Sequence, residues 1–590
     1  MKISSVEIHN WRSIVHDKID FNDLMIFIGQ NNHGKSNIQN AILFFFGELN
    51  VSEQDYNNGS TDLWVEIEFS GLNTQERLTF QKYVTVDKRI KVRKSATKTE
   101  GAKYSGYLEN PALEWLQEAH FSEYTNREAV VELPITEYLP ATGRITKETY
   151  ATAVSRYIEG NISEIVFRYE LETSNFLGAK NVAKGSFGDV YFIPSIKKAS
   201  EELTPRGNSV FAQLYARVIQ KMSESNETFI QAKQKIKELT EILNKQKTDG
   251  SINTERPADL SSLETLIGRE LESWNTTIDI QIGPPNVDDI FKLGATVIVD
   301  DGIKTEIDRK GHGLQRALIF ALIKAWSNLI HQNEELSSDS TEPLRRAGSN
   351  SSYFIFEEPE LFLHPQAQRE LFHSLVDLSK TESQVILCTH SSSFVDLDFY
   401  KSICIVKKDS VESGTKVLQF NDELFTELEE KKKFNLSYWI NPDRSELFFA
   451  KKVILLEGAT DKSVLPLLAK RLNSFKYDYT LIDCGSKDNI PQYIRLLNNF
   501  KINYVAVYDK DHQAGKGQQA IECANNSSTA IENVILSSLG SSVIFENDIE
   551  EELGMTEKAT NKAYRAISFV LQEGYEISDN MKLKIQAIYE

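Results

Sequence analysis

Residues 29–36 read Gly-Gln-Asn-Asn-His-Gly-Lys-Ser and match the pattern GxxxxGK[ST] at every fixed position. The apolar residues 24–28 precede this segment, and an apolar helix pattern follows it through Ile42 to Phe46. A strand, a glycine-containing loop and a helix form the context in which this pattern binds phosphate. The backbone N–H groups of such a loop curl around the phosphates, and the helix N-terminus adds its dipole. The segment therefore predicts a nucleotide site in an α/β fold.

This loop supplies most of the predicted nucleotide contacts. Lys35 is expected to reach the β- and γ-phosphates, and Ser36 is expected to hold the Mg²⁺ that accompanies ATP. The predicted ATP contacts of the loop are Gly29, Asn31, Asn32, Gly34, Lys35 and Ser36.

A buried strand pattern that ends in two carboxylates lies much further along the chain. Residues 353–359 read Tyr-Phe-Ile-Phe-Glu-Glu-Pro, which is the Walker B pattern. Glu357 is expected to support Mg²⁺ through water, and Glu358 is the predicted catalytic residue that orients the attacking water. The usual first carboxylate of this pattern is Asp, so Glu357 is a departure from it.

Two further segments complete the predicted nucleotide site. The strand pattern of residues 384–388, which read Gln-Val-Ile-Leu-Cys, leads to His390, a switch histidine that can sense the γ-phosphate. Residues 311–316 read Gly-His-Gly-Leu-Gln-Arg and open an apolar helix at the position of the ABC signature, although the customary signature serine is absent. This helix N-terminus would cap the γ-phosphate of ATP held by a second subunit. The predicted signature contacts are Gly311, Gly313 and Gln315.

Carboxylates follow two strand patterns in the C-terminal part of the chain. The apolar residues 453–456 lead to Glu457 and Asp461, and residues 504–508 lead to Asp509 and Asp511. Because ligand sites of parallel α/β sheets lie at the carboxyl ends of the strands, these side chains are expected to converge. Converging carboxylates repel one another unless hard cations such as Mg²⁺ or Mn²⁺ neutralise them. The pattern therefore predicts a site for one or two divalent metal ions.

A helical hairpin is predicted between the nucleotide-binding segments. Apolar residues recur at helical spacing on two segments joined by a polar turn, first Phe229, Ala232, Ile236, Leu239 and Leu243, then Leu263, Leu266, Ile267, Leu271 and Trp274. Amphipathic helices of this kind need a partner for their apolar faces. That partner is either another subunit or the chain's own nucleotide-binding domain, and the sequence leaves both alternatives open.

These motifs together resemble the ABC-type heads of RecF and SMC proteins and, more specifically, the overcoming-lysogenisation-defect (OLD) family. The resemblance is carried by Asn31 in the loop, by the segment at 311–316, and by Glu357-Glu-Pro-Glu followed by Leu363-His-Pro. It implies an α/β fold: an ABC-type ATPase head with a mixed sheet and a helical insertion, followed by a Rossmann-like Toprim domain with a parallel sheet. The predicted segments are 1–200 and 279–430 for the head, 201–278 for the insertion and 445–590 for the Toprim domain.

The resemblance also implies roles for residues of the Toprim segment. Glu457 and Asp461 are expected to bind one metal ion, and Asp509 and Asp511 to bind it or a second one. Among these, the predicted catalytic carboxylates are Glu457, Asp509 and Asp511. Glu550 is the expected metal ligand after the next strand, and Lys487 is a candidate phosphate contact. Four lysines are candidates for stabilising the transition state, namely Lys558, Lys562, Lys582 and Lys584.

The function implied by this resemblance is that of a DNA endonuclease that uses ATP and Mg²⁺ or Mn²⁺. ATP is expected to gate cleavage by changing the spacing of two heads within a homodimer or homotetramer. Kinship with bacterial anti-phage nucleases implies a defence effector, with a partner such as a helicase or a retron reverse transcriptase and its nucleic acid. The main alternative is a non-nucleolytic, DNA-binding ATPase of the RecF type, and topoisomerases and primases are further users of Toprim domains.

The bulk composition narrows these interpretations. A formal net charge of −19 argues against a protein that coats DNA, because that binding needs clustered Lys and Arg. Residues 82–103 are locally basic and form either a local DNA grip or a solvated edge strand. The 4 cysteines form no CxxC pair, and no signal peptide is recognised. Apolar runs also stay shorter than the roughly 20 residues of a membrane span, so a soluble cytoplasmic protein without a membrane partner is expected.

Overall fold

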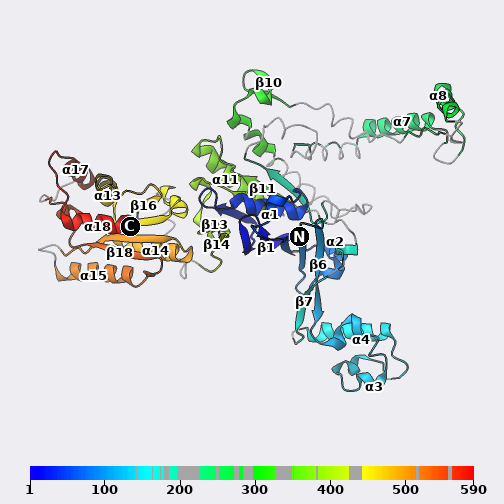
Figure 1. The fold of residues 1–590 in the computed structure, drawn as a ribbon, viewed down its shortest axis with the longest axis horizontal. Coiled ribbons are helices and arrows are strands. Elements are labelled where there is room, and N and C mark those ends of the chain that lie inside the picture. Colours follow the sequence, from blue (N-terminus) through cyan, green and yellow to red (C-terminus); the bar gives the residue numbers. More distant parts are fainter. Residues whose placement is uncertain are drawn as a thin grey trace. The chain divides into compact units, whose positions relative to one another are not determined.

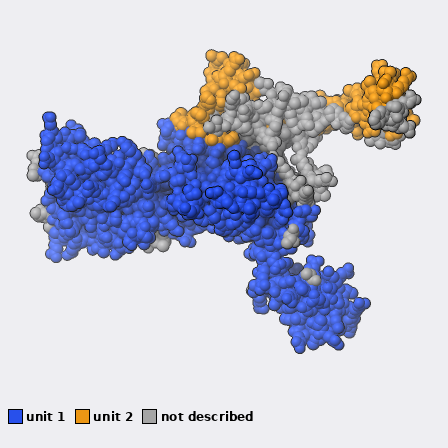
Figure 2. Space-filling view, viewed as in Figure 1, with its two compact units in different colours: residues 1–193, 343–360, 365–590 blue, residues 194–342, 361–364 orange. Residues whose placement is uncertain are grey.

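Figure 1 shows the fold of the computed structural model, and Figure 2 shows the two compact units into which the chain divides. One unit comprises Met1–Ile193, Pro343–Glu360 and Pro365–Glu590, and the other comprises Pro194–Glu342 and Leu361–His364. The structure describes residues 1–140, 142–162, 164–172, 174–178, 185–195, 211–212, 215, 219, 226–246, 251–271, 278–282, 297–315, 317–322, 325, 349, 351–380, 383–423, 442–512, 517–555 and 561–590.

An antiparallel sheet of six strands opens the first unit, in the order β2-β1-β4-β5-β6-β7. Its strands are β1 (Lys2–Trp11), β2 (Ile14–Asp20), β4 (Asp62–Ser70), β5 (Ile90–Thr97), β6 (Lys103–Pro111) and β7 (Phe167–Leu171). Alternate residues are buried along β5, as expected of a sheet with one covered face. Between β6 and β7 the chain inserts α3 (Arg127–Val130) and α4 (Lys147–Asn161), which share a small apolar core of their own.

The basic segment 82–103 is not a solvated edge strand. It contains β5, which lies between β4 and β6 in the interior of the sheet. Lys91 and Arg93 form ion pairs with Glu66, whose side chain is 2% exposed. The edge-strand expectation is therefore wrong, because period-two alternation is the same on an edge strand and on an interior strand. Lys91 and Arg93 thus neutralise a buried carboxylate of the neighbouring strand.

A second sheet carries the nucleotide motifs, in the order β14-β13-β3-β12-β11-β8. Its strands are β3 (Leu24–Ile28), β8 (Asp189–Ile193), β11 (Ser352–Glu357), β12 (Gln384–Cys388), β13 (Ile403–Lys408) and β14 (Thr415–Gln419). All pairs are parallel except β13 with β14. Every residue of β3 and β12 is buried, which fits a parallel sheet covered on both faces.

Helix α1 (Lys35–Phe46) contacts strands of both sheets, and α11 (Pro365–Ser379) packs on β12. Nine of the twelve residues of α1 are buried. The helix ends at Gly47, whose φ of 81° closes the last turn through N–H bonds to Leu43 and Phe44. Lys94 of β5 donates to the Phe44 carbonyl at 2.6 Å, and burial lowers the pKa of this lysine to about 8. The helix that follows the phosphate loop is thus fixed at its far end by the first sheet.

A parallel sheet of four strands forms the C-terminal part, in the order β16-β15-β17-β18. Its strands are β15 (Lys452–Leu456), β16 (Tyr479–Asp483), β17 (Asn503–Asp509) and β18 (Gly540–Phe545). Its helices are α13 (Ala459–Arg471), α14 (Ile490–Asn499), α15 (Gln518–Glu532), α16 (Ile549–Glu552), α17 (Lys562–Val570) and α18 (Asp579–Tyr589). One apolar core joins α13, α17 and α18 to β15 and β17. The predicted fold class, a mixed-sheet head followed by a parallel-sheet domain, is confirmed.

The remaining helices and 3₁₀ turns of the first unit are short. They are α2 (Thr74–Thr79) and the 3₁₀ turns Glu53–Asp55, Gln81–Tyr83, Glu114–Leu116, Glu118–His120, Pro134–Tyr138, Phe176–Gly178, Ser392–Phe394, Leu397–Ser402, Pro442–Phe449 and Lys487–Asn489. Among the described residues, no helix is long and apolar enough to cross a membrane.

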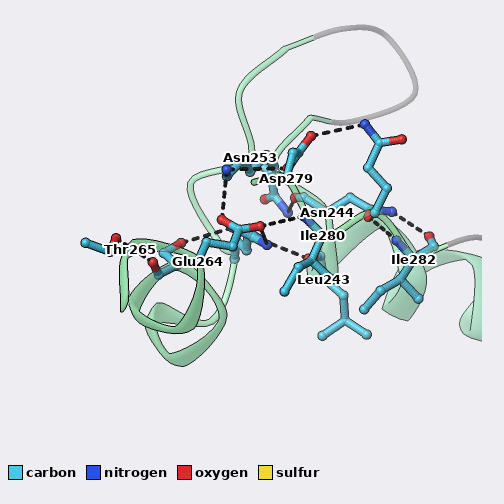
Figure 3. Close-up of polar contacts among 12 residues, drawn as sticks. Leu243, Asn244, Asn253, Glu264, Thr265, Asp279, Ile280 and Ile282 are labelled. Atoms are coloured by element: carbon cyan, nitrogen blue, oxygen red, sulfur yellow. Dashed lines mark hydrogen bonds and ion pairs between the residues drawn. The ribbon is translucent and has the colours of Figure 1, made fainter. Parts of the chain in front are cut away.

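The second unit contains the predicted hairpin as α7 (Glu227–Leu243) and α8 (Ala258–Glu270), together with β9 (Ile298–Asp300), β10 (Lys304–Glu306) and the turn Ile307–Arg309. Figure 3 shows the polar contacts that join its parts. Glu264 of α8 accepts two bonds from Arg256 at 2.9 and 2.7 Å and one from the N–H of Ile280 at 2.8 Å. Lys245 lies 2.8 Å from the same carboxylate. These partners, Arg256 first, hold the pKa of Glu264 far below its usual range.

The apolar face of this hairpin is partly open to solvent. Leu239, Leu263 and Leu266 are 58%, 47% and 59% exposed, and the other described residues of the predicted stripes are partly buried. Trp274, the last residue of the predicted stripe, lies outside the described residues. Dimer formation through these exposed side chains of the hairpin stays a prediction. The segment boundaries near residues 200, 278 and 430 also stay predictions.

Candidate functional site

The phosphate loop joins the end of β3 to the start of α1. Gly29 has a φ of +147°, and a Cβ there would lie 2.3 Å from the carbonyl oxygen of Val406 in β13. Gly34 has a φ of +102° and precedes the first residue of α1. Gly29 is therefore required because a side chain has no space there, and Gly34 is required because of its backbone conformation. Asn32 also adopts a positive φ, of 62°, while Asn31 is exposed beside it.

Lys35 is folded back onto its own loop in this structure. Its Nζ donates to the carbonyl oxygens of Gly29 at 2.9 Å and Gln30 at 3.0 Å. Burial lowers the pKa of Lys35, and Cys388 and Glu358 offset part of that effect. The ammonium must exchange these carbonyls for phosphate oxygens when nucleotide binds, and Ser36 follows it at the start of the helix.

The Walker B carboxylates and the switch histidine lie at the same edge of the sheet as the loop. Glu357 pairs in register with Cys388 of β12, the strand that leads to His390. Glu358 has a φ of 45°, its N–H donates to the Cys388 carbonyl at 2.8 Å, and its Oε1 lies 3.7 Å from His390 Nε2. Burial, followed by the charge of Lys35, lowers the pKa of His390 to about 4. Lys35, Glu358 and His390 are thus brought together as expected.

Glu360 also belongs to this edge, although the sequence patterns did not single it out. Its Oε1 accepts the backbone N–H of His390 at 2.6 Å, and its Oε2 accepts the Thr389 hydroxyl at 2.8 Å. The side chain is 8% exposed, and burial raises its pKa. Glu360 therefore ties the Walker B segment to the switch segment. Its position at the end of Glu-Glu-Pro-Glu was the available signal.

The signature residues lie in the other compact unit. Gln315 is 8% exposed and donates to the carbonyls of Ile307 at 3.0 Å and Lys310 at 2.9 Å. A Cβ at Gly313 would lie 3.3 Å from the Phe362 carbonyl, and Gly311 has open space around its Cα. The amide of Gln315 thus closes the turn that precedes the signature helix, and its part in nucleotide binding stays a prediction.

The Toprim carboxylates converge at the carboxyl edge of the four-stranded sheet. β15 and β17 are parallel neighbours, so Glu457 and Asp509 leave the sheet at the same edge. Glu457 Oε2 accepts the backbone N–H of Asp509 at 3.3 Å. Asp461, in the first turn of α13, is 5% exposed and accepts the N–H of Gly458 at 3.2 Å through Oδ2. Asp511 follows with a φ of 61°.

The electrostatics of this edge favour a bound cation. Burial, then the charges of Asp461, Glu457 and Asp511, raises the pKa of Asp509 to about 9. Burial, then Glu457 and Glu550, raises the pKa of Asp461 to about 7. Asp461 Oδ1 is also buried without a hydrogen-bond partner among the described residues. A divalent cation would relieve both the repulsion and the unpartnered oxygen, so the residues fit such an ion.

The described carboxylate side chains at this edge do not form a complete set of metal ligands in this structure. Within the described ranges, no group of three or more His, Cys, Asp or Glu side chains is arranged to hold a metal ion as it stands. Lys487 is 5% exposed, and its Nζ donates to the Asp509 carbonyl at 2.5 Å, beside these carboxylates. Asp548 is 7% exposed and contributes to the raised pKa of Asp509. Asp548 was not among the predicted site residues, whereas Glu550, two positions later on the same turn, was, and its charge contributes to the raised pKa of Asp461.

The structure separates the three candidate lysines that it describes. Lys562 Nζ lies 3.3 Å from Glu550 Oε1. Burial lowers the pKa of Lys562, but Glu550, Asp548 and Asp509 outweigh that effect and raise it. By contrast, Lys582 pairs with Asp579 at 2.8 Å, and Lys584 pairs with Glu552. Lys558 lies outside the described residues. Of the three described candidates, Lys562 is the one electrostatically coupled to the converging carboxylates.

Comparison with known families accounts for both parts of the chain. The AAA ATPase domain family matches residues 1–395, and the Toprim domain of overcoming-lysogenization-defect-like proteins matches residues 448–511. The chain belongs to the AAA ATPase domain family and carries an OLD-like Toprim domain. The first match covers the phosphate loop, Walker B and the switch histidine, and the second covers Glu457 through Asp511.

Curated nucleases are similar to this chain, two of them over most of its length. The Old nuclease of Escherichia phage P2 is 23% identical, over 90% of this chain and 82% of that protein. The Endonuclease GajA of Bacillus cereus (strain VD045) is 21% identical, over 88% and 77%. The OLD nuclease of Thermus scotoductus is 26% identical, over 44% and 48%. A solved SMC head bound to the C-winged helix domain of ScpA has a TM-score of 0.35 at 14% identity, covering 73% of this chain and 100% of that one, a value too low to identify a fold.

Proposed function

We propose that this protein is an ATP-binding, divalent-metal-dependent DNA endonuclease whose cleavage site is the carboxyl edge of the Toprim sheet. The observation that carries the proposal is the set of buried, mutually repelling carboxylates around Asp461 and Asp509, with one buried oxygen left unpartnered among the described residues. Such a set is costly without a cation, since buried charges need compensation. The nuclease names of the relatives from phage P2 and Bacillus cereus agree with this chemistry.

The proposed metal ligands are drawn from three elements of the sheet edge. They are Glu457, Asp461, Asp509, Asp511 and Glu550. Mg²⁺ or Mn²⁺ in this site would activate water and stabilise the leaving 3′ oxygen of a phosphodiester. Lys562 would place its ammonium beside the charge that develops on the phosphate, because it already lies among these carboxylates. Lys487, held by the Asp509 carbonyl, would fix the strand end that presents Asp509 and Asp511.

The nucleotide site is proposed to control this chemistry. Lys35 and Ser36 would bind phosphates and Mg²⁺, Glu357 would support the metal through water, and Glu358 would orient the attacking water. His390, largely neutral near pH 7 because its pKa is lowered to about 4, would report on the γ-phosphate through a neutral hydrogen bond. Gly311, Gly313 and Gln315 would act on ATP bound by a second copy. This arrangement implies at least a dimer for a complete pocket.

The proposed biological role is that of an anti-phage defence effector. It is supported by likeness to OLD-family proteins, including one named Endonuclease GajA. A helicase, or a retron reverse transcriptase with its nucleic acid, is the kind of partner that the role suggests. Cleavage would then be released by ATP, by the partner, or by both.

Plasmid cleavage with added Mg²⁺ or Mn²⁺ tests the nuclease proposal. We expect nicked or linear DNA from the wild-type protein and none from the Asp509→Ala/Asp511→Ala variant, which should still bind ATP. Removing these carboxylates weakens the cation site without opening an apolar core. DNA binding without cleavage in the wild type, under every divalent metal tried, would instead favour a non-nucleolytic ATPase of the RecF type.

A further inference from the structure

The edge strand β14 contacts the phosphate loop through a hydrogen bond. Thr415, the first residue of β14, is fully buried, and its hydroxyl donates to the carbonyl oxygen of His33 at 2.8 Å. Its backbone N–H donates to the Ser13 carbonyl at 2.7 Å. Ser13 Oγ lies 2.7 Å from Thr415 Oγ1. A strand far from the loop in sequence thus places a hydroxyl on one particular peptide of the loop, the peptide between His33 and Gly34.

The side-chain donors around Thr415 form a chain of hydrogen bonds with one direction. A hydroxyl has a single hydrogen, and Thr415 gives its hydrogen to His33. The Ser13 hydroxyl must therefore donate to Thr415 Oγ1. Asn37, in the first turn of α1, donates through Nδ2 to Ser13 Oγ at 2.7 Å. The resulting relay starts on α1, passes through Ser13 and Thr415, and returns to the loop at His33.

The start of the relay is fixed by an ion pair. Arg12 Nη1 donates to Asn37 Oδ1 at 3.4 Å, so the Asn37 amide is oriented with its NH₂ group toward Ser13. Arg12 is held in turn by Asp55, with Nε 2.8 Å from Oδ1. Hydrogen bonds in such a chain polarise one another, so the final bond to His33 is strengthened by those before it.

The relay selects the orientation of one peptide group. In a trans peptide the C=O and N–H point in opposite directions. Fixing the His33 carbonyl toward Thr415 therefore fixes the Gly34 N–H toward the opposite side of the peptide. The backbone itself does not enforce this choice, because Gly34 at φ +102° has access to both signs of φ. A Cβ at Gly34 would lie 2.5 Å from Thr415 Oγ1 and 2.9 Å from Ser13 Oγ, so the loop and the two hydroxyls are in close contact.

We infer that Thr415 is a positioning residue for nucleotide binding: its hydroxyl prevents the His33–Gly34 peptide from flipping and keeps the Gly34 N–H available to phosphate. The inference rests on ATP binding by this loop. A flipped peptide would present the His33 carbonyl oxygen to the phosphates in place of an N–H donor, and that contact is repulsive. Loss of the hydroxyl should therefore weaken ATP binding while the sheet stays folded.

The test measures the affinity of the full-length protein for a fluorescent ATP analogue with Mg²⁺. Thr415→Val keeps the branched shape and removes the hydroxyl, and we expect the Kd to rise about tenfold, which corresponds to about 1.4 kcal/mol. Thr415→Ser restores the hydroxyl and should bind within about twofold of the wild type. Ser413→Ala is the matched control, since Ser413 lies in the same hairpin and bonds to Ser410 instead of the loop. Ser413→Ala should leave the Kd unchanged.

Each alternative outcome is distinguishable. Wild-type affinity in a folded Thr415→Val variant would overturn the inference, and so would an equal loss in Thr415→Ser, which would implicate the methyl group. An equal loss in Ser413→Ala would also overturn it, by showing a general effect of the hairpin. If Thr415→Val does not fold, Ser13→Ala takes its place, because it removes the donor to Thr415; an unchanged Kd there refutes the relay. Failure of the wild type to bind would instead refute ATP binding by the loop.

Discussion

Replacing Asp461 by Asn should stabilise the metal-free protein, and the gain should grow with pH. Asp461 is buried beside Glu457 and Glu550, and these surroundings raise its pKa from 3.8 to about 7. A carboxyl whose pKa is raised on folding destabilises the folded state when it is ionised. That cost is absent below the unfolded pKa, accumulates as the pH rises toward 7, and is complete above it. Asn keeps an acceptor for the Gly458 N–H and carries no charge.

The magnitude follows from the two pKa values. At about pH 8 the wild-type protein should carry a penalty of about 4 kcal/mol, and at about pH 5 a penalty of about 1.7 kcal/mol. The advantage of Asp461→Asn over the wild type should therefore increase by roughly 2.5 kcal/mol between these conditions. For a domain of this size, that is several degrees in the unfolding midpoint, at about 2–4 °C per kcal/mol.

Thermal unfolding in EDTA, at both pH values, measures this difference. Glu573→Gln, on an exposed turn after α17, is the control, and its midpoint should differ from that of the wild type by the same amount at both pH values. Added Mn²⁺ or Mg²⁺ should raise the wild-type midpoint more than that of Asp461→Asn, because the ion needs this carboxylate. A stability difference that is the same at both pH values, or a variant less stable than the wild type at about pH 8, would refute the assigned burial and repulsion.

Three further predictions concern the nucleotide site, the role of Lys562 in cleavage, and the oligomeric state. Lys35→Ala should lose ATP binding and Glu358→Gln should retain it while hydrolysing slowly; equal ATP affinity in Lys35→Ala and the wild type would contradict the loop assignment. Lys562→Ala should reduce plasmid cleavage on the order of a hundredfold, whereas Lys582→Ala, whose lysine pairs with Asp579, should cleave normally; the reverse pattern would exclude Lys562. Light scattering without nucleotide should give at least a dimer, and Leu239→Glu/Leu266→Glu on the exposed hairpin face should dissociate it; a wild-type mass of 67.1 kDa at micromolar concentration would exclude constitutive assembly.

The sequence by itself determined those features that short, contiguous patterns encode. Residues 29–36 specify a loop whose glycines need particular backbone angles and space, and the structure has both at Gly29 and Gly34. Buried apolar runs followed by carboxylates or His390 identify strands of a parallel sheet, since such strands are covered on both faces. From these patterns followed the edges at which Glu357 and Asp509 lie, and the family resemblance that the patterns carry implied the fold class and the order of the two domains.

Only the tertiary structure decided which residues from distant segments meet. The pattern of β5 is compatible with an edge or an interior strand, and its pairing with β4 and β6 made it interior. Four lysines were equivalent in sequence, and Lys562 was distinguished by its distance to Glu550. Thr415 had no motif of its own, and the motif that contains Glu360 did not specify its role, because their partners, His33 and His390, belong to other segments. Hydrogen bonds and charge repulsion act over a few ångströms, so their partners are fixed by chain packing and leave no periodic trace in the local sequence.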